Sequence, residues 1–157
     1  MRSSLKVGFS FGLASATITT LGLMVGLHSG THSKLVVVGG ILTIALADAF
    51  SDSLGIHVSQ EFRGKSRKQV WESTLATFVT KLAFASTFVI PVVLLSLSLA
   101  VAVALVWGLS LLAVFSFLMA RKQRTNPWKV VAEHLGIAIL VVLASHFLGD
   151  WLAMRFK

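Results

Sequence analysis

The chain has 157 residues, of which 55% are hydrophobic and only 13% are charged, and its mean hydropathy is +0.85. A soluble domain of this length rarely has such a composition, so we predict a membrane protein. The chain contains no cysteine, which excludes disulfides and thiolate metal ligands. A metal would have to be bound by oxygen, nitrogen or methionine sulfur.

Five apolar segments are long enough for one membrane crossing, which takes roughly 20 residues. We therefore predict an all-α, polytopic membrane protein with a single transmembrane domain over residues 1–157. Its five helices are expected at residues 7–27, 35–58, 70–95, 97–120 and 128–152.

The first segment, 7–27, could also be a signal peptide with a cleavage site at Ala14-Ser15-Ala16. Its apolar pattern continues through Leu27, which favours a retained helix. Small residues recur at every fourth position in this segment, at Gly8, Gly12 and Ala16. Such spacing lets another helix approach closely, so we expect the first helix to be central in the bundle.

The boundary between the third and fourth helices has few sequence signals. Residues 82–120 form one apolar run without a charge, which is too long for a single crossing. Pro91 and the Ser96-Leu97-Ser98 stretch are its only interruptions. We predict a bend at Pro91 and a tight hairpin close to Ser96.

Lys and Arg residues are distributed unevenly between the two sides of this five-helix arrangement. One side has only Lys34, Arg155 and Lys157. The other side has ten: Arg2, Lys6, Arg63, Lys65, Arg67, Lys68, Arg121, Lys122, Arg124 and Lys129. Positively charged short loops stay in the cytoplasm, so we predict a cytoplasmic N-terminus and a C-terminus outside or in a lumen. The net charge of +8 then reflects topology and anionic lipid headgroups, not nucleic acid.

Two carboxylates, Asp48 and Asp52, lie four residues apart inside the second apolar segment. A charge near mid-membrane costs at least about 2.5–3.5 kcal/mol, so this pair must face protein, water or a cation. Four residues are about one helical turn, which places both carboxylates on one face. The resulting polar stripe indicates an ion path.

Lys81 is the only cation predicted inside the third helix. At about 1.5 Å per residue, it lies about 16 Å from the cytoplasmic start of that helix, and Asp48 lies about 15 Å from the cytoplasmic end of its own. This match in depth predicts an ion pair between Lys81 and Asp48. The pair would either lock the bundle or act as a gate that an arriving cation or proton weakens.

More metal-binding residue types are predicted nearer the cytoplasm, where several helix ends would form one vestibule. Carboxylates with imidazoles suit Mn²⁺, Fe²⁺, Co²⁺ or Zn²⁺, and carboxylates alone would suit Mg²⁺ or Ca²⁺. Alternatively, the three glutamates pair with basic neighbours at the headgroup level. The expected metal-binding set is Asp48, Asp52, His57, Glu61, Glu72, Glu133 and His134.

At the opposite end, His146 and Asp150 lie one turn apart in the last helix, and His28 and His32 flank the first external loop. We expect His146 and Asp150 to form an exit site, although interfacial His and Asp residues are also often simply solvated. The chain lacks a nucleophile motif, a Gly-rich phosphate loop after a strand and an H-E-x-x-H motif. We therefore do not expect an enzyme.

Two segments, GLASATITTLGLMVG at 12–26 and ADAFSDSLG at 47–55, together with Ile90-Pro91, resemble the vacuolar iron transporter family. Members of that family carry Fe²⁺ and Mn²⁺ out of the cytosol. The resemblance implies a five-helix protomer that works as a homodimer, with the metal path between the first helices of two subunits and protons in exchange. Ser15 and Thr19 would then line this path.

The sequence departs from the family pattern at two positions of the site. Ser15 stands where the family usually has an aspartate, and Asp52 stands where it has a methionine. The resulting all-oxygen site is harder and selects less for iron. This is also a short form, because residues 59–69 replace the family's cytoplasmic metal-binding domain.

We therefore expect a transporter that exports Fe²⁺ or Mn²⁺ from the cytoplasm, with the metal as substrate and without a permanently bound cofactor. Its partners would be a second copy of the chain, the membrane lipids and the metal ion. The membrane would be the cell membrane of a prokaryote, or the vacuolar membrane in a eukaryote. The alternatives are a non-transporting scaffold or sensor protein, and a transporter of another cation or small solute.

Overall fold

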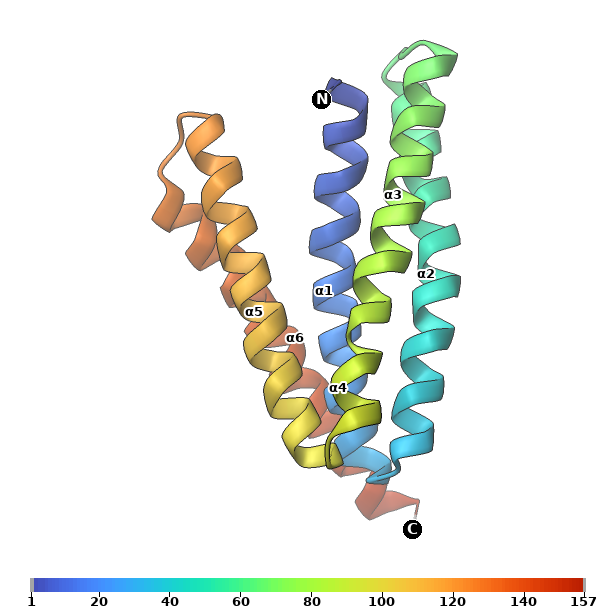
Figure 1. Ribbon diagram of the computed structural model, residues 1–157, viewed down its shortest axis with the longest axis vertical. Helices are drawn as coiled ribbons and strands as arrows, with labels where there is room; N and C mark the ends of the chain where they lie inside the picture. The colour runs from blue at the N-terminus through green and yellow to red at the C-terminus, as the bar shows by residue number, and fades with distance from the viewer. Residues whose placement is uncertain (1, 157) are drawn as a thin grey trace.

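The computed structural model describes residues 2–156 and is all-α (Figure 1). Within this range the helices are α1 (Ser3–Thr31), α2 (Lys34–Phe62), α3 (Arg67–Thr87), α4 (Val89–Leu94), α5 (Leu97–Lys122) and α6 (Pro127–Arg155). α3 and α4 follow one another as a single membrane-length unit, so the described residues form five helices long and apolar enough to cross a membrane. The predicted fold class is confirmed.

Polar residues in the short connections cap the N-termini of several helices. The Ser33 side chain accepts a hydrogen bond from the backbone of Val36 at the start of α2. Asn126 caps α6, and Pro127 occupies its first turn. Ser33 and Asn126 accept hydrogen bonds from backbone N–H groups of the first turn, and Pro127 has no N–H group that needs a partner. α2 and α6 therefore begin next to these residues. The helices consequently extend several residues past the apolar segments.

The bend and the hairpin predicted near Pro91 and Ser96 are both present. α3 ends at Thr87, four residues before Pro91, because a proline has no N–H for the carbonyl of the fourth residue before it. α4 then continues to Leu94, and Ser96 lies in extended conformation at the start of α5. The long apolar run is thus divided into two crossings.

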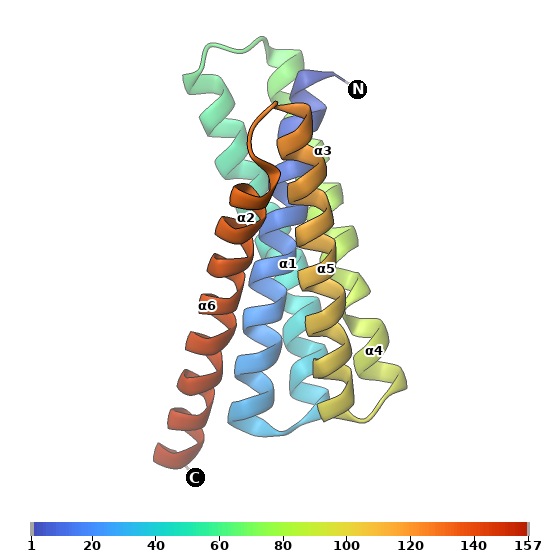
Figure 2. The same cartoon turned by 90° about the vertical axis from the view of Figure 1, so that its left-hand side faces the viewer.

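α1 lies between the α2–α3 pair and the α5–α6 pair, as Figures 1 and 2 show. Gly8 and Gly12 face α3: a Cβ atom on Gly12 would lie 2.9 Å from the Thr77 carbonyl oxygen. Further along α1, Gly26 faces α6, where a Cβ atom would lie 3.2 Å from the Ser145 carbonyl oxygen. The predicted central position of the first helix is confirmed.

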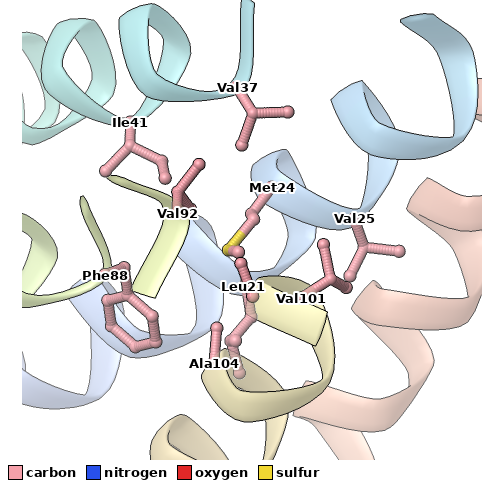
Figure 3. Packing of buried hydrophobic residues seen from close by; sticks show 10 residues of the cluster. Leu21, Met24, Val25, Val37, Ile41, Phe88, Val92, Val101 and Ala104 are labelled. Carbon is pink, nitrogen blue, oxygen red and sulfur yellow. The ribbon is translucent and has the colours of Figure 1, made fainter. Parts of the chain in front are cut away.

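An apolar core closes the bundle at the end where α1 finishes (Figure 3). Leu21, Met24, Ile41 and Phe88 are at most 1% exposed there, and α1, α2, α4 and α5 all contribute to this core. Towards the other end the α5–α6 pair diverges from α2 and α3 (Figure 1). The two ends of the bundle therefore differ in how tightly the helices gather.

The N-terminus and the connections at 63–66 and 123–126 lie at one end of the bundle (Figure 1). The connections at 32–33 and 95–96 and the end of α6 lie at the other. All ten basic residues that were predicted to share one side therefore lie towards the first end. We call it the basic end, and the other the C-terminal end.

Candidate functional site

A buried ammonium group joins three helices near the middle of the bundle. Lys81 of α3 is 1% exposed, and its Nζ lies 2.7 Å from Asp48 Oδ2 of α2. The same Nζ donates hydrogen bonds to Asp52 Oδ2 and, at 2.8 Å, to Ser15 Oγ of α1. Ser15 Oγ in turn donates to Asp52 Oδ2 at 2.6 Å. We call these four residues the inner site.

The helix packing explains why these residues meet. Asp48 and Asp52 project from one face of α2 because they are one turn apart. Gly12 lets the backbones of α1 and α3 approach, with its Cβ position 3.3 Å from the Lys81 backbone nitrogen. This close approach brings the Lys81 backbone next to α1, so the Lys81 side chain can contact Ser15. Ala16, Ala45 and Ala85 pack together one turn or less from these residues along their helices.

The inner site has more negative than positive charge when all its groups are ionised. Asp48 and Asp52 share one ammonium, which leaves a net charge of minus one, and each carboxylate side chain is only 22% exposed. The contact of Asp48 Oδ2 with Lys81 lacks hydrogen-bond geometry, and this buried oxygen accepts no hydrogen bond from the described residues. The site therefore has oxygen acceptors and negative charge available for a cation.

The predicted pair of Lys81 with Asp48 is confirmed. Sequence reasoning placed Asp52 nearer the cytoplasm and apart from this pair, but Lys81 contacts Asp52 as well. The physical reason is that one helical turn is about 5.4 Å long, a distance that a central ammonium bridges by lying between the carboxylates. Sequence reasoning also missed the hydrogen bonds of Ser15. Thr19, which was expected to line the path with Ser15, donates a hydrogen bond from its hydroxyl to the Ser15 backbone carbonyl oxygen at 2.9 Å.

The other residues expected in one vestibule lie in separate places. His57 Nδ1 is 3.0 Å from Thr74 Oγ1, and its Nε2 is 3.4 Å from Glu61 Oε1. Glu72 pairs with Arg2 and accepts a 2.5 Å hydrogen bond from Ser4. These contacts link α2 with α3, and α3 with the start of α1.

The two candidates from the last helix lie elsewhere again. His134 Nδ1 is 2.7 Å from Ser116 Oγ of α5, and Glu133 is exposed. The physical reason is that α6 packs on α1 and α5, so α1 separates it from α2 and α3. Within residues 2–156, no three His, Asp or Glu side chains form a group that could hold a metal ion. The expected single vestibule of ligands is therefore not formed within one chain.

At the C-terminal end, His146 and Asp150 lie one turn apart on α6, and their role as an exit site stays a prediction. His146 Nε2 lies 3.5 Å from Asp150 Oδ2, and His146 Nδ1 lies 2.5 Å from Ser29 Oγ of α1. The His28 and His32 rings have centroids 5.4 Å apart. His28 lies in the last turn of α1, and His32 follows that helix as its C-cap.

Comparisons with models of protein families, with curated proteins and with solved structures find no match to this chain. Inference of its function therefore rests on its own residues, including the segments 12–26 and 47–55, and on their geometry.

Proposed function

We propose that the protein is a membrane transporter that exports a divalent transition-metal cation, Fe²⁺ or Mn²⁺, from the cytoplasm. The cation would bind at Asp48 and Asp52, with Ser15 as a further oxygen ligand and Lys81 as the internal cation that it displaces. The observation that carries this proposal is the shared ammonium: two partly buried carboxylates contact one lysine. The resemblance of residues 12–26 and 47–55 to vacuolar iron transporters supports the same substrate and a homodimer.

A purely structural role is less suited to this arrangement. One carboxylate would neutralise Lys81, and a neutral buried pair would be enough to hold α2 against α3. A second carboxylate adds an uncompensated charge that is costly within the membrane. A transporter needs this excess charge to attract its substrate, whereas a scaffold does not.

Charge balance supports exchange of the metal for protons. The inner site has two carboxylates and one ammonium, so a divalent cation added to it would leave a net charge of plus one. Release of one proton from the site, when the metal displaces Lys81 from the carboxylates, would leave it neutral.

The basic end is the cytoplasmic side in this proposal, because short positively charged loops stay in the cytoplasm. An open groove of about 520 Å³ lies between α2 and α3, with a mostly apolar lining that includes Phe50, Leu54, Trp71, Ser53, His57 and Thr74. Beyond the inner site, the apolar core around Met24 and Phe88 blocks the way to the C-terminal end (Figure 3). A cation at the inner site would therefore need a rearrangement of this core to leave toward the C-terminal end.

Single cysteines test the orientation, because the chain has no cysteine of its own. Cysteines at Ser66 and Gln123 should react with an impermeant thiol reagent only from the cytoplasmic side. Cysteines at Ser33 and Met154 should react only from outside. Labelling of Ser33 and Ser66 positions from the same side would contradict the five-crossing topology.

Uptake into sealed proteoliposomes tests the transport proposal. We expect uptake of Mn²⁺ and Fe²⁺ in preference to Mg²⁺, with countertransport of protons, measured by an enclosed pH dye. Zn²⁺ is included as a further competitor. Asp52→Asn should abolish uptake because an amide keeps the shape but not the charge.

Glu133→Gln is the matched control, since this exposed carboxylate lies away from the inner site, and its uptake should equal that of the wild type. Absence of uptake for all four cations, or full uptake by Asp52→Asn, would contradict the proposal. The first result would favour a scaffold or sensor, or a carrier of another solute.

A further inference from the structure

One buried hydroxyl group of α1 has no hydrogen-bond partner among residues 2–156. Thr20 is fully buried, and its Oγ1 forms no hydrogen bond with any described group. In the described part of the chain, the only other buried side-chain atom without a partner is Asp48 Oδ2 of the inner site. Burial of a hydroxyl without a partner is unfavourable, and such atoms are few in native proteins. Thr20 therefore calls for an explanation beyond packing.

The other threonines of α1 show that the helix does not force this lack of a partner. Thr17 is equally buried, and its hydroxyl donates to the Leu13 carbonyl oxygen at 2.9 Å. Thr19 and Thr31 make the same bond to the carbonyl four residues before them. A threonine inside a helix reaches this carbonyl through its choice of χ1. Thr20 does not make the bond, so its hydroxyl oxygen is available to a ligand.

Thr20 lies between the inner site and the apolar core. It is one turn beyond Ala16 and one turn before Met24, on the same face of α1. Ala16 packs with small residues of α2 and α3 next to the inner site, and Met24 belongs to the apolar core. A cation that leaves the inner site toward the C-terminal end has to pass this level of the bundle.

The two oxygens without partners lie at similar depths in the bundle. α1 ends at Thr31 and α2 begins at Lys34, so residues of both helices can be counted from the C-terminal end. At about 1.5 Å per residue, Thr20 lies about 17 Å from that end and Asp48 about 21 Å. The difference is less than one helical turn. Asp48 is also the carboxylate of the inner site that lies nearer the C-terminal end, because Asp52 is one turn further along α2.

We propose that the Thr20 hydroxyl receives the cation as it leaves Asp48 and is its next oxygen ligand on the way to the C-terminal end. This inference rests on the proposed transport function and concerns the same single cation. A neutral hydroxyl can replace one water of the cation without holding the ion as strongly as a carboxylate does. Transport needs ligands that bind strongly enough for entry and weakly enough for exit.

Uptake of Mn²⁺ by the full-length protein in sealed proteoliposomes tests this role. Thr20→Val keeps the shape of the side chain without its hydroxyl, and should lower the maximal uptake rate about 5–10-fold, the size of one lost polar contact. Equilibrium binding of Mn²⁺ in detergent should not change, because Asp48 and Asp52 hold the ion before Thr20 does. Thr20→Ser should retain uptake. Thr17→Val, whose lost hydroxyl bonds only its own helix, is the matched control and should also retain it.

Thermal unfolding in detergent separates a role in transport from a structural one. Thr20→Val should leave the unfolding temperature unchanged or raise it, because it removes a buried hydroxyl without a partner. A lower unfolding temperature would mean that the hydroxyl is needed for the fold, and would overturn the inference. Uptake at the wild-type rate in Thr20→Val, or equal losses in Thr20→Val and Thr20→Ser, would overturn it as well. Absence of uptake by the wild type would instead refute the proposed function, and this role with it.

Discussion

Asp48→Asn and Asp52→Asn should each change the stability of the protein by about 1 kcal/mol or less, whereas the two together should lower it by about 3–5 kcal/mol. Each single change leaves Lys81 with one ionised partner, so only a shared contact is lost. The double change leaves a 1% exposed ammonium without a counter-charge, which is the costly event in a buried ion pair. The losses should therefore be strongly non-additive.

Thermal unfolding in detergent, followed by circular dichroism, measures this cycle. Adding Lys81→Met to the double variant should recover much of the lost stability, because methionine fills a similar volume without a charge. A large loss in Asp48→Asn alone, with no further loss on adding Asp52→Asn, would mean that Lys81 depends on Asp48 only. The uncharged triple variant should fold but not transport, which separates the structural role of the site from the proposed one.

The sequence was sufficient for the fold because membrane thickness sets the length of each apolar segment. It also predicted the pairing of Lys81 with Asp48, since depth in the membrane follows from counting residues along a helix. Counting gives only the position along the membrane normal. It does not give which helices are neighbours, and so His57 and Glu133 were expected in one vestibule although α1 separates their helices.

The position of Asp52 shows a second limit of sequence reasoning. Asp52 lies one turn from Asp48 and therefore at a different depth, but the Lys81 side chain is long enough to contact both carboxylates. Ser15 could be singled out only through the family resemblance, as a departure from the usual aspartate. Its hydrogen bonds to both Lys81 and Asp52 depend on the rotation of α1 about its own axis, which the sequence pattern of small residues did not fix.

Gly149→Ala should destabilise the protein, although alanine is intrinsically the better helix former. The added methyl group would overlap the Gly26 carbonyl oxygen and lie 2.9 Å from Ser29 Cβ. The carbonyl belongs to the α1 backbone, so relief requires the two helices to move apart. Such overpacking typically costs about 1–3 kcal/mol, and here it should exceed the gain of about 1 kcal/mol in helix propensity.

Gly136→Ala is the matched control, since it lies in the same helix with nothing within 4 Å of its Cβ position. The same substitution there should leave the unfolding temperature unchanged or raise it. Gly8→Ala extends the test to the other face of α1, where the new Cβ would lie 2.7 Å from Ala76 Cβ of α3. Destabilisation by Gly8→Ala but not by Gly149→Ala would mean that α1 packs closely on α3 only, and α6 would then have to lie farther from α1 than the structure places it.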